Sequence, residues 1–322
     1  MKKSELNHHR LEKIILVQPR GFCAGVKRAI EAVEQLLERY GPPLYVRHQI
    51  VHNHHVVADF EKRGVIFVVD IQQIPLKARV VFSAHGSPPE LYLHAKEREL
   101  EIIDATCPLV TKVHLEAKKF AREGYFIFYI GHNGHPETVG VLGEVSPDKI
   151  VLIETLNQAK KVLPPQTDKL VILNQTTLSF DETEMIVACL KQRFPKVVLP
   201  LGKDVCYATQ NRQEAVKALA KRVDLILVIG SQISSNSQRL CEVAQTAGVK
   251  AFLIEDALAI DPAWLRSTRV LGITSGASVP ESLISELVEK FRQNNPYLSI
   301  EEMVIKDESQ IQFALPKELK GA

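Results

Sequence analysis

The sequence predicts an α/β fold of three similar α/β units, arranged as a pseudo-threefold trefoil around a central cavity and built on mainly parallel sheets. Two observations predict it. First, an apolar strand, a polar turn, a cysteine and an amphipathic helix follow one another three times, around Cys23, Cys107 and Cys206. Second, further apolar runs alternate with helical patterns in each copy, which is typical of parallel sheets covered by helices. An internal repeat of this length predicts how the whole chain folds, and not only one local site.

The first strand and helix of each copy surround its cysteine. We expect a strand at 13–18 before Cys23, and the apolar segments EIID and VVLPL precede Cys107 and Cys206. After each cysteine, apolar residues recur at helical spacing. They are Val26, Ile30, Val33 and Leu37 in the first copy, Val110, Val113, Ala117 and Phe120 in the second, and Val216, Leu219, Ala220 and Val223 in the third. Each cysteine therefore lies where a strand gives way to a helix.

The second strand of each copy ends in a polar loop. The strands are expected at 44–47 (which contains LYV), YFIFYIG (125–131) and DLILVIG (224–230). The loops that follow them are HQIVHNHH (48–55), GHNGHPE (131–137) and GSQISSNS (230–237). Counted from the cysteine of its own copy, His52 lies 29 residues on (52 − 23), His135 lies 28 on (135 − 107) and Ser235 lies 29 on (235 − 206). The copies thus stay in step well beyond the cysteine.

Two more strands complete each copy. The third is expected at 65–69, IVLI (150–153) and AFLI (251–254), and the fourth at 79–83, LVILN (170–174) and VLGITS (270–275). The fourth strand runs into a second polar turn, which holds His85, Thr176 or Ser278. Ser, Asp, Pro and acidic residues at these turns are typical of helix starts.

The repeat sets the expected units. They cover 12–106, 107–203 and 204–300, each about 95 residues, which is an ordinary domain size. A C-terminal tail at 301–322 contains a possible strand, EEMVIKD. Ligands of parallel α/β sheets bind at the carboxyl ends of the strands. All six polar turns and the three cysteines lie at such ends, so we expect them to face one cavity.

Composition limits the classes of protein. Hydrophobic residues make up 45% of the 322 and charged residues 24%, as in soluble globular proteins. A net charge of +2 gives no broad basic field, so no nucleic-acid partner is expected. The N-terminus lacks the apolar region of a secretory signal, and no apolar run approaches the ~18 residues that span a membrane. We expect a soluble, cytoplasmic protein, and a monomer because one chain already supplies three units.

The five cysteines fall into two groups. Cys189 and Cys241 lie within helical apolar patterns, which indicates buried thiols rather than a disulfide framework. Cys23, Cys107 and Cys206 occupy equivalent turns, which favours one shared metal centre. Three thiolates suit zinc or an iron–sulfur cluster, and their separations of 84 (107 − 23) and 99 (206 − 107) residues fit neither a zinc ribbon nor a ferredoxin. Either metal centre would keep one open position.

The polar turns indicate an anion site next to that centre. They supply neutral donors and no lysine: His52, His85, His135, Thr176, Ser234, Ser235, Asn236 and Ser278. Imidazoles, hydroxyls and helix N-terminal N–H groups bind phosphate oxygens well, so a diphosphate is a suitable ligand. Glu137 is the one acid within the six turns.

Nine segments of the chain resemble the signatures of the LytB-type hydroxymethylbutenyl diphosphate reductase family, which closes the non-mevalonate isoprenoid pathway. They are GFCAGVKRAI, VHN, SAHGSP, DATCPLV, GHPE, NQTTLS, CYATQNRQEA, SSNSQRL and GASVP, in this order from about residue 13 to 290. The N-terminal dozen residues and the tail carry none of these signatures.

The resemblance implies a [4Fe–4S] cluster on Cys23, Cys107 and Cys206, with one open iron. It implies a substrate diphosphate held by His52, His85, His135, Ser234, Ser235, Asn236 and Ser278. Glu137, Thr176 and His135 would be catalytic, with Glu137 and Thr176 positioning and protonating the allylic hydroxyl at the open iron. Two electrons from ferredoxin or flavodoxin, with loss of water, would give isopentenyl and dimethylallyl diphosphates.

Two other functions compete with this one on the residues alone. A zinc-dependent phosphate-ester hydrolase would use the same cavity without redox chemistry. A non-catalytic iron–sulfur redox sensor would use the cluster without the acid and the anion site, and such sensors usually carry a DNA- or partner-binding segment, for which the sequence shows no signal.

Overall fold

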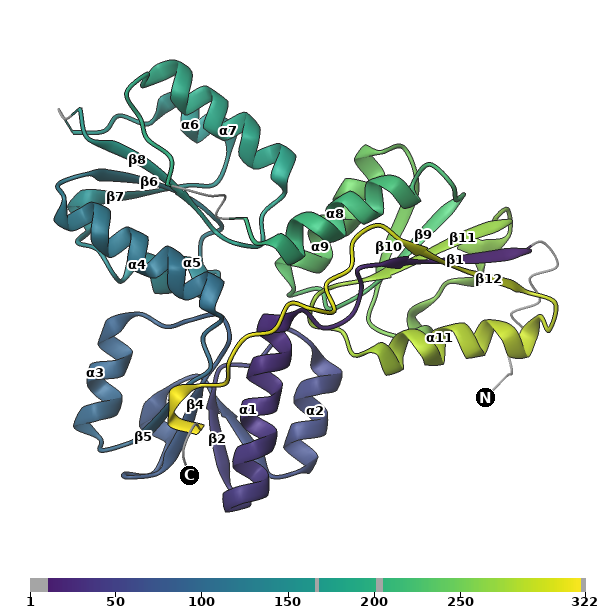
Figure 1. Ribbon diagram of the computed structural model, residues 1–322, viewed down its shortest axis with the longest axis horizontal. Coiled ribbons are helices and arrows are strands. Elements are labelled where there is room, and N and C mark those ends of the chain that lie inside the picture. Colours follow the sequence, from purple (N-terminus) through teal and green to yellow (C-terminus); the bar gives the residue numbers. More distant parts are fainter. Residues whose placement is uncertain (1–10, 166–167, 201–204, 320–322) are drawn as a thin grey trace. The chain divides into compact units, whose positions relative to one another are not determined.

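The computed structural model describes residues 11–165, 168–200 and 205–319 (Figure 1). These residues form three parallel sheets distributed over two compact units. Unit 1 contains the chain up to Cys23, His52–Val56 and Tyr207–Ile311, and unit 2 contains Ala24–Val51, Val57–Cys206 and the chain from Gln312. Every pair of neighbouring strands is parallel, which confirms the predicted fold class.

Unit 1 is built on a five-stranded sheet with the strand order β10-β9-β11-β1-β12. Its strands are β1 (Lys13–Gln18), β9 (Leu225–Ile229), β10 (Lys250–Ile254), β11 (Val270–Ser275) and β12 (Ser299–Val304). Side chains alternate between two apolar clusters: Ile14 joins one, and Ile15 joins the other. Both faces of the sheet are therefore buried, as the nearly continuous apolar strands require.

Helices cover both faces of this sheet. Helices α8 (Tyr207–Leu219) and α9 (Ser235–Thr246) lie on one face, and α11 (Glu281–Asn294) lies on the other, with the short α10 (Pro262–Leu265) before β11 (Figure 1). On α11, apolar residues three and four apart face the sheet: Leu283, Ile284, Leu287, Val288 and Phe291. The helix is thus held by its apolar stripe.

Unit 2 contains two smaller sheets. The first has the order β3-β2-β4-β5, with strands β2 (Leu44–Arg47), β3 (Val65–Val68), β4 (Arg79–Phe82) and β5 (Glu101–Asp104). Figure 1 shows its helices, which are α1 (Ala24–Tyr40), α2 (His54–Lys62) and α3 (Pro89–Glu97).

The second sheet of unit 2 has the order β7-β6-β8. Its strands are β6 (Phe126–Ile130), β7 (Ile150–Ile153) and β8 (Leu170–Asn174). One face packs on the helices α4 (Pro108–Arg122) and α5 (Pro136–Leu142), and the other packs on α6 (Leu156–Lys161) and α7 (Phe180–Arg193). Among the described residues, the strands and helices expected from the repeat are present in all three copies, except that the segment before Cys206 forms only an isolated bridge at Val198.

One strand is in a different sheet from the one expected. β1 was expected in the 12–106 unit, but it pairs with β11 and β12 in unit 1. In contrast, β5 pairs with β4 within the 12–106 range, and Val198 forms a bridge with Val171 of β8 within the 107–203 range. The segment before each cysteine therefore pairs with the fourth strand of another copy. The expected boundary at 203–204 lies outside the described residues.

The expected tail at 301–322 does not form a separate part. Its first residues belong to β12, which pairs along the whole of β1. Farther on, Ala314 accepts a hydrogen bond of 2.7 Å from Arg28 of α1, and the buried Leu319 accepts one of 3.4 Å from Arg39. The tail thus contributes a strand to unit 1 and packs against α1 within unit 2. None of the helices in the described part of the chain has the length and apolar character needed to cross a membrane.

Candidate active site

The three repeat cysteines have the same local structure. Each is the residue immediately before a helix: α1 begins at Ala24, α4 at Pro108 and α8 at Tyr207. Each also donates its backbone N–H to a carbonyl in the second polar turn of another copy of the repeat. The bonds run from Cys23 to Ala277 (3.1 Å), from Cys107 to Ala84 (3.0 Å) and from Cys206 to Thr176 (3.0 Å). The predicted structural equivalence of these cysteines is confirmed.

The other two cysteines have different surroundings. Cys241 is 8% exposed within a core cluster, and burial raises the pKa of its thiol to about 12. Cys23, Cys107 and Cys206 are only partly buried, and all five cysteines are free of disulfides. Thiolates near helix N-terminal N–H groups are good ligands for iron and zinc. The donor set of the three repeat cysteines therefore fits an iron–sulfur cluster, whereas Cys241 remains a buried thiol.

In unit 1, the turn after β11 gathers several of the predicted site residues. Ser278 donates a hydrogen bond of 3.0 Å from its Oγ to the carbonyl of His52, and Ala277 accepts the bond from Cys23. A Cβ added at Gly276 would lie 3.5 Å from Nδ2 of Asn236. This single turn thus brings Cys23, His52, Asn236 and Ser278 together.

The N-terminus of α9 adds the serines. Ser234 is the N-cap of this helix, and its side chain accepts the N–H of Ser237 at 3.3 Å. Asn236 is 6% exposed, and neither atom of its amide has a hydrogen-bond partner among the described residues. A buried amide without partners is costly, and it lies where the helix favours an anion. Asn236 is therefore well placed to bind one.

In unit 2, Glu137 and Thr176 form a buried pair. Both are 4% exposed. Oε2 of Glu137 accepts the backbone N–H of Thr176 at 3.0 Å and its hydroxyl at 2.8 Å. Burial raises the pKa of Glu137, although the two hydrogen bonds from Thr176 oppose the rise. Since Oε2 accepts both bonds, Oε1 is the oxygen suited to carry a proton.

His135 caps the same helix and lies beside His85. Its Nδ1 accepts the N–H of Glu137 at 3.2 Å, and its ring centroid lies 6.3 Å from that of His85. Burial and the neighbouring His132 lower the pKa of His135 to about 4, so its imidazole is neutral at pH 7. A neutral ring that accepts at Nδ1 carries its proton on Nε2. His135 can therefore donate a hydrogen bond from Nε2 without a positive charge.

Behind Glu137, a third histidine supports the helix. His114 of α4 is 7% exposed, and its Nδ1 lies 2.8 Å from Oε1 of Glu144. Although burial opposes it, hydrogen bonds from His114 and Lys118 lower the pKa of Glu144. A Cβ added at Gly86 or Gly140 would lie 2.9 Å from the His114 ring. The ring therefore fills the space between the His85 turn and helix α5.

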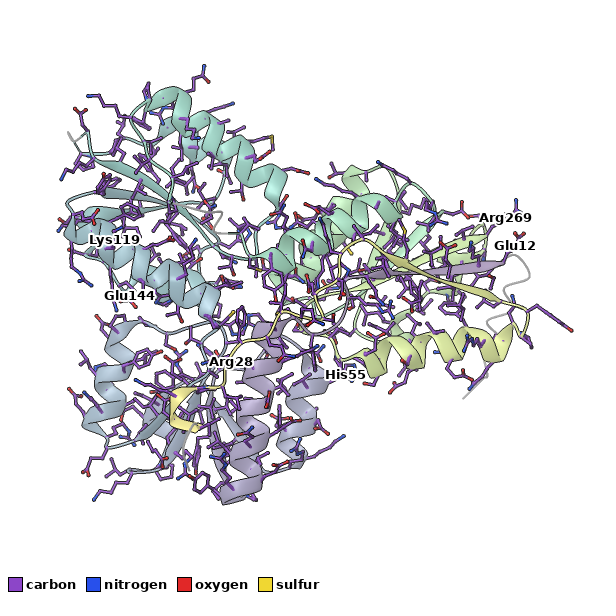
Figure 2. All side chains as sticks on the ribbon, viewed as in Figure 1. Glu12, Arg28, His55, Lys119, Glu144 and Arg269 are labelled. Atoms are coloured by element: carbon purple, nitrogen blue, oxygen red, sulfur yellow. The ribbon has the colours of Figure 1, made fainter. Side chains whose placement is uncertain are left out.

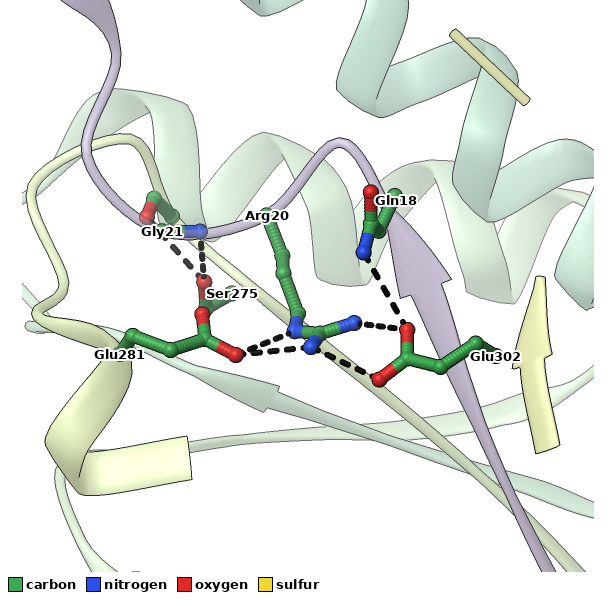
Figure 3. A network of polar contacts seen from close by, with 7 residues as sticks. Gln18, Arg20, Gly21, Ser275, Glu281 and Glu302 are labelled. Carbon is green, nitrogen blue, oxygen red and sulfur yellow. Dashed lines mark hydrogen bonds and ion pairs between the residues drawn. The ribbon is translucent and has the colours of Figure 1, made fainter. Parts of the chain in front are cut away.

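Within the loop that leads to Cys23, Arg20 binds two carboxylates. Figure 3 shows its guanidinium between Glu281 and Glu302, with bonds of 2.7 Å to each. The backbone N–H of Gly21 donates to the Oγ of Ser275 at 2.8 Å. Glu281 opens α11, and Glu302 lies on β12, so this network fastens the Cys23 loop to two neighbouring elements of unit 1.

Arg212 holds the same loop from α8. Its side chain is fully buried, and it donates to the carbonyl of Gly21 at 2.8 Å while pairing with Glu308 at 3.1 Å. The exposed fraction of the Glu308 side chain is 12%. An arginine with no exposed surface needs such partners, because an unpaired buried charge is very unfavourable.

We expect Arg212→Ala to lower the free energy of unfolding by about 3–5 kcal/mol, because it leaves the Gly21 carbonyl without its donor and Glu308 without its cationic partner, with the hydrogen bond from Asn211 remaining. Urea unfolding measures this. The matched control is Arg222→Ala, which removes an ion pair with Glu301 in which both side chains are partly exposed, and should cost no more than about 1 kcal/mol. Equal losses for the two variants would contradict the role given to burial.

Each predicted site residue thus lies in one of two groups. Unit 1 holds Cys23, His52, Ser234, Ser235, Asn236 and Ser278, and unit 2 holds His85, Cys107, His135, Glu137, Thr176 and Cys206. Neither group, within the part of the chain that is described, contains three or more side chains in metal-binding geometry. Sequence reasoning missed Arg20, His114 and Arg212. His114 and Arg212 could have been found in the sequence, because each places a polar side chain at a helical position that otherwise faces the core.

Comparison with known proteins gives a consistent result. The family model described as LytB protein matches residues 14–292. A 4-hydroxy-3-methylbut-2-enyl diphosphate reductase from Mycobacterium ulcerans is 51% identical over 311 residues, which cover 96% of this chain and 93% of that protein. The protein of the same name from Nitrosomonas europaea is 46% identical over 312 residues, covering 95% and 96% of the two chains.

Solved structures show the same similarity. That of the E-1-hydroxy-2-methyl-but-2-enyl-4-diphosphate reductase from Plasmodium falciparum is 37% identical, with a TM-score of 0.92 over 95% of this chain and 96% of that one. A structure of (E)-4-hydroxy-3-methyl-but-2-enyl diphosphate reductase, described as the terminal enzyme of the non-mevalonate pathway, is 31% identical. Its TM-score is 0.63, over 88% of this chain and 100% of that one.

Proposed function

This chain belongs to the LytB protein family, and we propose that it removes the allylic hydroxyl of 4-hydroxy-3-methylbut-2-enyl diphosphate by reduction. The substrate takes up two electrons and two protons, its C–O bond breaks, and the oxygen leaves as water. The remaining five-carbon diphosphate is isopentenyl or dimethylallyl diphosphate. This is the last step of the non-mevalonate route to isoprenoid precursors.

The observation that carries the proposal is the equivalent backbone hydrogen bond that each of the three cysteines makes. Cys23, Cys107 and Cys206 each donate to a second polar turn, and those turns supply His85, Thr176 and Ser278. Each proposed metal ligand is therefore tied to a proposed substrate-binding or catalytic residue. Thiolates held this way would bind a [4Fe–4S] cluster, which supplies electrons and an open iron for the hydroxyl oxygen.

The neutral donors would bind the diphosphate. Asn236 offers an unpartnered amide at the N-terminus of α9, and His135 offers the N–H at Nε2. We place His52, His85, Ser234, Ser235 and Ser278 in the same role. Neutral donors suit this ligand because they bind phosphate oxygens without adding a positive charge. The charge of a lysine would lower the pKa of the nearby acid, Glu137.

The acid would be Glu137. Hydroxide is a poor leaving group, so the departing oxygen needs a proton. The burial that raises the pKa of Glu137 keeps a proton on it at higher pH than on an exposed carboxyl. Thr176 holds Oε2 of that carboxyl from two sides, which leaves the proton on Oε1. We propose that Glu137 gives this proton to the hydroxyl.

One purification and one assay separate this function from the two competing ones. Protein isolated without oxygen should be brown. It should contain about four iron atoms per chain, the content of one [4Fe–4S] cluster. A zinc hydrolase would be colourless. With dithionite-reduced methyl viologen as donor, the iron protein should convert the allylic diphosphate to the two products, whereas a redox sensor would not.

A substitution tests the anion site. We expect Asn236→Ala to weaken binding of the substrate roughly tenfold to a hundredfold, because a hydrogen bond to a charged group contributes about 1.5–3 kcal/mol. Isothermal titration with the diphosphate measures this. Because the amide has no partner within the described chain, the variant should lose no stability. Gln238→Ala, two residues on at an exposed position of α9, is the control. Unchanged affinity in Asn236→Ala would place the anion elsewhere.

A further inference from the structure

A cleft of about 490 Å³ lies along the first three turns of α4 in unit 2. It is lined by Arg28, Thr106, Pro108, Thr111, Lys112, Leu115, Glu116 and Lys119. No residue among them belongs to the two groups of site residues described above. Arg28 and Lys119 can be found in Figure 2.

The cleft combines positive charge with an apolar contact. Three lining side chains are cationic and one is acidic, namely Glu116, which pairs with Lys112 at 3.4 Å. Leu115 projects among them and is 58% exposed. An apolar centre with a charged rim is the composition of a protein-binding surface, and the sign of the rim selects an acidic partner.

Arg28, one of the residues that line the cleft, is held by hydrogen bonds to backbone carbonyl groups. Its guanidinium donates to the carbonyl oxygens of Thr106 at 2.9 Å, Asp104 at 3.4 Å and Ala314 at 2.7 Å. The carboxylate of Asp104 is instead hydrogen-bonded by Tyr92 and Thr106. Carbonyl groups orient a guanidinium without forming an ion pair with it. The carboxylates of Asp104 and Glu318 act on Arg28 only through their electrostatic field, so Arg28 still adds positive charge to the cleft.

The cleft also reaches one of the proposed cluster ligands. Thr106 and Pro108, the residues on either side of Cys107, both line it. A protein seated there would contact the chain on both sides of Cys107, which is how it would approach the proposed cluster.

From these observations we propose that this cleft docks a small acidic one-electron carrier protein of the ferredoxin type, which delivers electrons by way of Cys107. The inference rests on the proposed function, because that reaction consumes two electrons per turnover. Each carrier is oxidised by one electron, so two carriers dock in succession. The rim of Arg28, Lys112 and Lys119 steers the acidic carrier, and Leu115 provides the apolar contact.

The test uses full-length protein with its cluster and a plant-type [2Fe–2S] ferredoxin as the probe. Stopped-flow absorbance follows reduction of the cluster, which needs no substrate. We expect the double charge reversal of Lys112 and Lys119 to Glu to slow reduction by ferredoxin roughly tenfold or more at low salt. The same variant should be reduced by dithionite at the unaltered rate. Added salt should slow the reaction of the original protein and have little effect on the variant.

The control reverses two other lysines of unit 2. Lys160 and Lys161 are exposed on α6, and changing both to Glu alters the net charge by the same amount away from the cleft. Equal slowing in this control would overturn the proposal, because net charge alone would then explain the effect. Equal slowing with dithionite, or competition by inorganic diphosphate, would also overturn it. Cluster reduction without turnover of the allylic diphosphate would instead reject the proposed function and leave the docking site standing.

Discussion

Replacement of Cys107 by Ser is expected to remove most of the bound iron, the brown colour and the activity. Its N–H is held by Ala84 and helix α4 begins at the next residue, so the backbone at this position should persist. A serine hydroxyl stays protonated at neutral pH and is a much weaker ligand for an iron–sulfur cluster than a thiolate. Iron content and the visible spectrum of protein purified without oxygen measure the result, and Cys23→Ser and Cys206→Ser should behave alike.

The two remaining cysteines provide the control for this experiment. Cys241→Ser places a hydroxyl in a core cluster and should lower stability, yet it should leave the spectrum unchanged. Cys189→Ser, on α7, should do the same with a smaller loss because Cys189 is only partly buried. A Cys107→Ser protein with full iron content and turnover would refute the assignment of the three ligands.

Replacement of Glu137 by Gln is expected to lower turnover at least ~100-fold, the usual scale for a positioned acid. Glutamine keeps the shape and can still accept the bonds from Thr176, but it has no proton to give. The variant should retain its iron and bind the substrate. Turnover with reduced methyl viologen measures the effect, and near-normal turnover at full iron content would remove Glu137 from the mechanism.

The pH dependence gives a second signature of Glu137 that does not need activity. Its pKa is raised in the folded protein, so between the unfolded value of about 4.3 and the folded value the unfolded chain loses a proton that the folded chain keeps. Stability therefore falls as the pH rises through that window. Glu137→Gln removes this loss, so its stability relative to the original protein should grow with pH. A constant difference would mean that the carboxyl ionises normally.

Local patterns in the sequence determined the elements of this protein. Apolar residues at a spacing of three to four, or in short unbroken runs, predicted the helices and strands of all three copies, because such patterns record which faces are buried. The repeat also gave the equivalence of Cys23, Cys107 and Cys206, since each stands at the same strand-to-helix turn. Glu137 stood out as the one acid in the polar turns.

Only the tertiary structure decided which sheet each strand joins. The β1 segment is apolar on both faces, and any parallel sheet could bury it equally well, so nothing local assigns it to β11 and β12. The same holds for side chains whose properties depend on distant partners. Arg212 is paired by Glu308, 96 residues away, and Glu137 is held by Thr176, 39 residues away. Burial and hydrogen bonds between residues so far apart in the chain exist only once it has folded, and they set the protonation of the site.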